Sequence, residues 1–167
     1  MSADAIQMTG RLEPRQGWTA DRCSLAKALE VVRTRSAFLI LREAFYGATR
    51  FEEFAERTGL SEPVTAAQLR ELTKAEILRR EPYREPGQRT RERYRMTDKG
   101  AELLPVLVAL MQWGDRWLQE GGAPVELRHE GCGALVSAQM RCDEDHRVEL
   151  QELELAPGHR ARRHRAS

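Results

Sequence analysis

The sequence predicts a mainly α-helical fold with one β-hairpin and a small C-terminal appendage of strands and loops. Apolar residues recur at helical spacing over much of the chain from about residue 21 to residue 118, whereas residues 91–96 alternate with a period of two. These patterns place a helical domain at residues 20–120 and the appendage at residues 121–156. We expect the N-terminal arm, residues 1–19, to be flexible and the Arg- and His-rich tail, residues 157–167, to be disordered.

Composition narrows the class of protein. The chain has 167 residues, of which 41% are hydrophobic and 32% charged, so it can bury a core of ordinary size. The first residues contain no apolar segment typical of a secretory signal, no apolar run can cross a bilayer, and three cysteines make no disulfide framework. We therefore expect a cytoplasmic protein without a membrane partner. No nucleophile elbow, phosphate loop or dinucleotide fingerprint is present, so the sequence predicts no enzyme.

Two helices open the helical domain. Leu25, Leu29 and Val32 stand at i, i+4 and i+7, which is the spacing of one helical face. The dense apolar run at residues 37–45 predicts a buried central helix that ends at Gly47.

The next two helices are short and close together. Thr49 and Glu52 have the spacing of a capping box, Gly59 ends the first of the two helices, and Ser61 followed by Pro63 begins the second. The inward stripe of the second helix is expected at Val64, Leu69, Leu72 and Ile77. Two short helices joined by a glycine-containing turn form a helix-turn-helix.

A basic hairpin follows. Residues 81–97 read as strand, turn and strand, with the tip at Pro86 and Gly87. From Arg79 to Lys99, eight basic residues stand against four acidic ones, which gives a local charge of +4 in a chain whose net charge is only +1. A helix-turn-helix followed by such a hairpin predicts a winged helix-turn-helix that binds nucleic acid through local charge.

The last helix is expected to start at Thr97, with Asp98 at its positive end. Its apolar residues wrap most of the way round, which implies a partner helix; they are Leu103, Leu104, Leu107, Val108, Leu110, Met111, Trp113 and Trp117.

Six segments in this order resemble the HxlR family of winged helix-turn-helix regulators, relatives of the MarR group. They are 23–29 (CSLAKAL), 38–43 (FLILRE), 50–54 (RFEEF), 68–72 (QLREL), 94–100 (YRMTDKG) and 113–118 (WGDRWL). The resemblance implies a transcriptional regulator, more specifically a repressor, that forms a homodimer through its first and last helices. The second helix of the helix-turn-helix would then lie in the major groove of double-stranded DNA, with the wing beside it on the backbone.

The chain also departs from that family. Ser36 stands where members often have an aromatic residue, and Glu76 where many have glycine. Alanine and proline occupy much of the outward face of the recognition helix, and only Arg70 and Gln68 can read a base edge by two hydrogen bonds. The candidate DNA-binding residues are Ser61, Pro63, Ala66, Ala67, Gln68, Arg70, Lys74, Arg89, Arg91 and Arg93. The alternative is a winged-helix interaction or architectural module with little base readout.

Cys23 is a candidate redox sensor. It stands two residues after Asp21, which can cap the first helix, and close to Arg22 and Lys27. A helix N-terminus and nearby cations favour the reactive thiolate. In redox- and electrophile-sensing members of the resembled family a cysteine at this place is the sensor, which implies an oxidant or small-molecule effector. The alternative is a small apolar residue at the dimer seam.

Zinc is the one cofactor that the sequence suggests. His129 and Cys132, then Cys142 and His146, form two pairs at spacings that suit tetrahedral zinc, with Asp145 as an alternative ligand. The resemblance here is to C-terminal zinc knuckles of some family members. The alternatives are a plain strand hairpin and a disulfide between the two cysteines.

Overall fold

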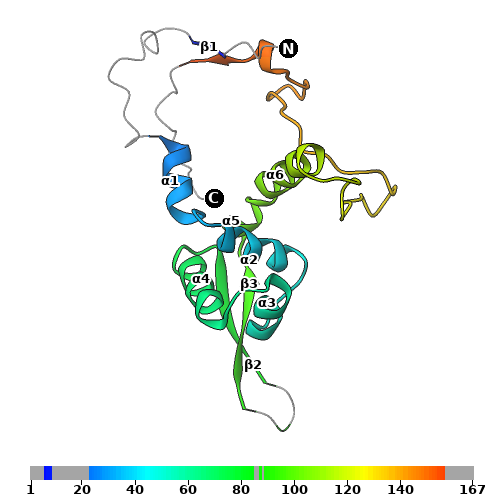
Figure 1. Cartoon of the computed structure of the whole chain (residues 1–167). Helices are drawn as coiled ribbons and strands as arrows, with labels where there is room; N and C mark the ends of the chain where they lie inside the picture. The colour runs from blue at the N-terminus through cyan, green and yellow to red at the C-terminus, as the bar shows by residue number, and fades with distance from the viewer. Residues whose placement is uncertain (1–5, 9–22, 85–86, 88, 157–167) are drawn as a thin grey trace. The chain divides into compact units, whose positions relative to one another are not determined.

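The computed structural model describes residues 6–8, 23–84, 87 and 89–156 (Figure 1). Tertiary contacts divide the chain into two units, residues 20–138 and residues 1–19 together with 139–167. Most of the expected arm and the whole expected tail lie outside the described residues.

The larger unit has the element order of a winged helix-turn-helix, so the predicted fold class is confirmed. Its elements are α1 (Ser24–Val31), α2 (Arg35–Phe45), α3 (Phe51–Thr58), α4 (Glu62–Lys74), β2 (Leu78–Tyr83), β3 (Arg91–Met96), α5 (Asp98–Ala101) and α6 (Leu104–Trp117). Strands β2 and β3 pair antiparallel and extend as a hairpin beyond α3 and α4 (Figure 1).

Helix α2 is the centre of the core, as its dense apolar run predicts. Ile40 and Leu41 are almost fully buried and pack with residues of α3, α4, β2 and the link between α4 and β2, namely Phe54, Leu69, Leu72, Leu78 and Ile77. Tyr94 of β3 meets the Phe54 ring edge-on, with centroids 6.0 Å apart, and burial raises the pKa of its hydroxyl. The hairpin is thereby attached to the helical core at its base.

Helix α3 begins one residue later than the sequence predicts. Its N-cap is Arg50 rather than Thr49, and Glu53 rather than Glu52 closes the cap. Glu53 Oε2 accepts hydrogen bonds from the backbone N–H groups of Thr49, at 2.7 Å, and Arg50, at 3.0 Å. Two donors that would otherwise be orphaned at the helix start are thus satisfied by one carboxylate.

The Glu53 cap makes stability depend on pH. The backbone hydrogen bonds from Thr49 and Arg50 hold the pKa of Glu53 below its ordinary value. The stabilisation is therefore complete above the ordinary carboxyl pKa of about 4.3 and is lost as the pH falls through the lowered value. We expect Glu53→Ala to cost about 1 kcal/mol at pH 7, and Glu53→Gln, which can still accept these bonds, to cost less. Urea unfolding at pH 7 and pH 3.5 checks this; equal acid sensitivity in wild type and Glu53→Gln would contradict it.

Helix α4 buries a slightly different stripe from the predicted one. Leu69 and Leu72 are buried, but Thr65 occupies the inward position expected for Val64, which is 39% exposed. The helix ends at Lys74, so the buried Ile77 lies between α4 and β2 rather than on the helix. Between them Glu76 adopts the left-handed conformation, with φ of 60°, which accounts for the glycine that many family members carry there.

The last predicted helix is in fact two helices, α5 and α6. Thr97 caps α5 as predicted, because its hydroxyl accepts a hydrogen bond from the Gly100 backbone N–H at 3.0 Å. The break follows from Pro105, which has no N–H to donate and whose ring is compatible only with the first turn of a helix. Helix α6 accordingly restarts with this proline in its first turn.

Gly100 lies in close contact with the strand hairpin. A Cβ at this position would overlap with the backbone carbonyl oxygen of Ile77 and lie 2.5 Å from Met96 Sδ. We expect Gly100→Ala to lower the free energy of unfolding by about 3 kcal/mol, because the carbonyl cannot move without disturbing its hydrogen bond from the Thr97 N–H. Gly114→Ala in α6 is the matched control, since its Cβ would meet no atom within 4 Å. Denaturant unfolding checks the pair; equal stability of the two variants would contradict the close contact.

The appendage consists of short strands and turns, as predicted, together with one turn of 3-10 helix at Leu150–Glu152. Within the larger unit, a β-bridge joins Arg128 and Leu135. Within the smaller unit, a bridge joins Arg141 and Arg147, and the two-residue strands β1 (Gln7–Met8) and β4 (Glu154–Leu155) pair in parallel. No helix among the described residues is long and apolar enough to cross a bilayer.

Candidate nucleic-acid interface

One face of α4 points to solvent and carries most of the predicted base-contacting residues. Pro63, Ala66, Arg70 and Lys74 are exposed, and Ala67 is half-buried. Their spacing of i, i+3, i+4, i+7 and i+11 keeps them on one side of the helix. Ser61 is the N-cap residue, as predicted, but its side chain makes no capping hydrogen bond. The face presents two cations and a largely apolar surface to a ligand.

Gln68 lies apart from this face. It is half-buried, and its Oε1 accepts a hydrogen bond from the Thr34 hydroxyl at 3.2 Å. Thr34 is the N-cap of α2 and also accepts from the Ala37 N–H. Gln68 therefore links the recognition helix to the start of α2, which leaves Arg70 as the long polar side chain best placed to reach a base edge.

The register of the wing separates its side chains into two faces. Arg79 pairs with Arg95, Glu81 with Arg93, and Tyr83 with Arg91, and residues directly opposite each other share a face. We call this the basic face of the wing; its four arginines and one glutamate give a local charge of +3. The other face carries Leu78, Tyr94 and Met96, which pack against the core. All the arginines of the basic face are at least partly exposed.

Glu81 organises the basic face. Its carboxylate lies 3.0 Å from Arg79, 3.2 Å from Arg93 and 3.7 Å from Arg95. The Arg79 hydrogen bond, followed by the charge of Arg79 and the contribution of Arg93, lowers the pKa of Glu81. One acid thus holds three guanidinium groups side by side, and two charges remain in excess within this cluster. Such a group suits a polyanion, because each phosphate that it neutralises releases bound counterions.

Sequence reasoning missed three members of this surface. Arg79 and Arg95 share the basic face with the predicted Arg91 and Arg93, and Arg50 at the start of α3 lies over the Tyr83 ring, 5.3 Å from its centroid. The predicted Arg89 is exposed near the tip of the hairpin. Which arginines share a face depends on the cross-strand register. The register depends in turn on the length of the turn, and the alternation within one strand does not reveal that length.

Two helices of the larger unit expose apolar side chains. Helix α1 buries none of its residues and exposes Leu25 and Leu29. On α6, Val106, Leu110, Trp113 and Trp117 are 51–67% exposed and stand at i, i+4, i+7 and i+11. We call these four residues the α6 stripe. A contiguous apolar face of this kind marks an interaction surface.

Cys23 is an exposed free thiol at the start of α1. It occupies the N-cap position itself, so the predicted cap at Asp21 is wrong; Asp21 and Arg22 lie outside the described residues. The residue is therefore closer to the orphan N–H groups of the helix start than the sequence indicates.

The predicted zinc ligands fall in both units. In the larger unit, His129 Nδ1 lies 3.2 Å from Cys132 Sγ. Cys142, Asp145 and His146 belong to the smaller unit. Both cysteines are free and exposed, and among the described residues no group of three or more His, Cys, Asp or Glu side chains is arranged to hold a metal. The zinc site stays a prediction.

Residues 31–121 match the family model described as HxlR-like helix-turn-helix, which covers more than half of the chain. The chain belongs to the HxlR-like helix-turn-helix family. Its matched region contains α2 to α6 and therefore the helix-turn-helix, the wing and the α6 stripe. The resemblance seen in the sequence is thus confirmed.

Similar proteins and solved structures include other transcriptional regulators. The chain is 39% identical over 120 residues to the HTH-type transcriptional regulator Rv3095 of Mycobacterium tuberculosis, covering 71% of this chain and 75% of that protein. The crystal structure of PA1607 is 31% identical, with a TM-score of 0.71, over 86% of this chain and 96% of that chain. The redox regulator HypR in its reduced form is 25% identical, with a TM-score of 0.50, over 55% and 90%. The HxlR-like chain is a helix-turn-helix transcriptional regulator, and the prediction that it is no enzyme is confirmed.

Proposed function

We propose that this regulator is a homodimeric repressor that occludes promoter DNA. The observation that carries the proposal is the basic face of the wing, an exposed surface of charge +3 in the same unit as the outward face of α4. Packing alone does not require four arginines on one side of a hairpin. Phosphate contacts from this face and from Lys74 would position the duplex, while Arg70 would read a base.

The second copy of the chain is the partner that fits the exposed apolar helices. An eight-residue helix such as α1 is marginal in water unless its apolar side is covered. The α6 stripe contains two exposed tryptophans, the residue type most enriched among interface hot spots. A two-fold pairing of α1 and α6 would bury both surfaces and set two recognition helices against neighbouring half-sites.

A competition experiment with promoter DNA tests the proposal. Fluorescence anisotropy with a labelled duplex from the region flanking the regulator's own gene is expected to show saturable binding. An unlabelled scrambled duplex should displace the labelled one at least 100-fold less well than the unlabelled duplex of the same sequence does. Occupancy of that site in cells should lower transcription from the neighbouring promoter. Equal displacement by both duplexes would favour the alternative, an architectural or interaction module without base readout.

We infer that Cys23 makes the repressor responsive to oxidants. The exposed thiol at the α1 N-cap, next to the proposed dimer surface, supports this role, as does the similarity to a redox regulator. We expect hydrogen peroxide, which oxidises a single thiol to a sulfenic acid and is itself reduced to water, to release the wild-type protein from DNA, whereas Cys23→Ser should bind with unchanged affinity and stay bound. Cys132→Ser and Cys142→Ser are matched controls and should still be released. Normal release of Cys23→Ser would refute the role of Cys23.

A further inference from the structure

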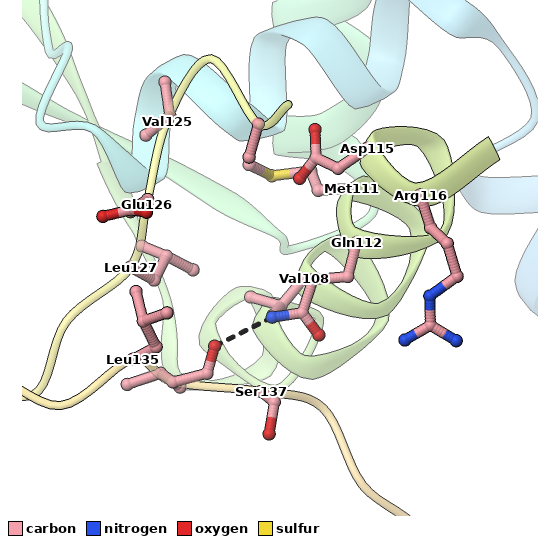
Figure 2. A pocket seen from close by; sticks show the side chains of 12 residues that line it. Val108, Met111, Gln112, Asp115, Arg116, Val125, Glu126, Leu127, Leu135 and Ser137 are labelled. Atoms are coloured by element: carbon pink, nitrogen blue, oxygen red, sulfur yellow. Dashed lines mark hydrogen bonds between the residues drawn. The ribbon is translucent and has the colours of Figure 1, made fainter. Parts of the chain in front are cut away.

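A cavity of about 490 Å³ lies between α6 and the segment formed by residues 123–137 (Figure 2). Its walls are mostly apolar: Val108 and Met111 come from α6, and Val125, Leu127 and Leu135 from the facing segment. This size and lining are typical of sites for small organic ligands. The segment 123–137 lies beyond the residues that match the family model, so the cavity is an addition to the winged-helix core.

Gln112 of α6 fixes the facing segment to the helix by hydrogen bonds to its backbone. Its side-chain Nε2 donates to the Val136 carbonyl oxygen at 2.8 Å (Figure 2). Its Oε1 accepts from the Ala138 N–H at 2.9 Å. One amide therefore anchors the facing segment to α6 through two backbone bonds. Because this wall of the cavity is already fixed, a ligand that binds there loses less free energy to ordering the protein chain.

The cavity and the α6 stripe occupy opposite sides of the helix. Val108, Met111, Gln112 and Asp115 repeat at i, i+3, i+4 and i+7, whereas the stripe runs through Val106, Leu110, Trp113 and Trp117. At about 100° per residue the two sets point in opposite directions. A second copy of the chain seated on the stripe would leave the cavity accessible.

Among the charged side chains that line the cavity, the Asp115 carboxylate and the Arg116 guanidinium make no ion pair with another described residue. Asp115 is half-buried, and among the described residues no side chain pairs with it. Two other charged residues near Asp115 are engaged, because Arg42 pairs with Glu43 at 2.6 Å and Glu126 pairs with Arg128. Met111, Asp115 and Arg116 all line the cavity, and in Figure 2 the Arg116 side chain extends away from Leu127 and Leu135. Asp115 also lines an adjoining cavity of about 500 Å³ between α2 and α6.

We propose that this cavity binds a small apolar organic cation, with the ammonium group on Asp115 and the hydrocarbon body against Val108, Met111, Leu127 and Leu135. An isolated carboxylate at the edge of an apolar cavity attracts a cation with charge-assisted hydrogen bonds, and the apolar body supplies the buried area. A neutral ligand would leave the Asp115 carboxylate unpaired, and an anionic group placed beside Asp115 would be repelled by it.

Three ligands with the same hydrocarbon body test the proposal on the full-length protein. They are 4-phenylbutylammonium, 4-phenylbutan-1-ol and 4-phenylbutyrate, titrated by calorimetry or by NMR shifts. We expect the cation to bind at least tenfold more tightly than the alcohol, and the anion most weakly. Asp115→Asn should make the cation bind no more tightly than the alcohol, whereas Arg116→Gln, the matched control, should keep the preference. Leu135→Trp, at a position that is 61% exposed, should block all three ligands by filling the cavity.

Three results would overturn the proposal: no saturable binding of the cation, equal affinity for cation and alcohol, or a preference that survives Asp115→Asn. Unfolding curves of each variant confirm that loss of binding is not loss of the fold. DNA affinity without ligand should not change in Asp115→Asn, so failure of this inference is distinguishable from failure of the proposed repressor function.

Discussion

Replacing Arg91 and Arg93 together by glutamate is expected to weaken DNA binding roughly 100-fold, on the order of tenfold for each reversed charge. Both residues lie on the basic face of the wing, and reversing them changes its local charge from +3 to −1. The salt dependence should fall as well, by about one unit of log–log slope for each phosphate that the variant no longer neutralises. Anisotropy titrations at several salt concentrations measure both effects.

The matched control is the double variant with lysine at the same two positions. Lysine keeps the charge and so should retain most of the affinity, because phosphate contacts depend on charge more than on geometry. The glutamate variant must also have the same free energy of unfolding as the wild type to within about 1 kcal/mol. This is expected because Glu81 keeps Arg79 and Arg95 as partners. Wild-type affinity in the glutamate variant would show that the wing does not contact DNA.

Trp113→Glu is expected to dissociate the proposed dimer. Trp113 is 55% exposed at the middle of the α6 stripe, and a buried charge facing a second apolar stripe has no partner there. We expect the dimer dissociation constant to rise by more than 100-fold, and DNA affinity to fall with it because two linked half-sites become two separate ones. Sedimentation velocity at protein concentrations from about 1 to about 100 µM measures the change in the dimer dissociation constant. This range spans roughly the dissociation constants expected of a moderate interface.

Val64→Glu provides the control for that variant. Val64 is also exposed and apolar, at 39%, but lies on α4 rather than on α1 or α6. The substitution should leave the sedimentation coefficient unchanged. A wild-type protein that sediments as a monomer throughout the range would exclude the dimer, and a Trp113→Glu variant that remains dimeric would move the interface to another surface.

The sequence predicts most of the fold because its signals are local. Helical spacing and caps place α2, α3 and α4 to within a few residues, and the period of two identifies the wing. The capping error arises because Thr49–Glu52 and Arg50–Glu53 have the same spacing, and only the backbone geometry selects between them. The last predicted helix is split at Pro105. A proline permits either a kink within one helix or the start of a new helix, so the sequence alone does not select between the two.

The interface itself was harder to predict because it depends on non-local pairing. Arg79 joins Arg95 on the basic face through a cross-strand register, and Gln68 turns toward Thr34, which is 34 residues away in sequence. The cavity beside α6 combines helix residues with a segment outside the family match. The match to PA1607 covers 86% of the chain, more than residues 1–121 can supply, so that similarity extends past residue 121.

The most direct test of the account is the stoichiometry of the complex with DNA. Native mass spectrometry of the protein with a pseudo-palindromic duplex from its own promoter should show two chains per duplex, and the glutamate variant of Arg91 and Arg93 should give none. One chain per duplex, or equal occupancy of a scrambled duplex, would contradict the claim that a dimer reads DNA with α4 and the basic face of the wing.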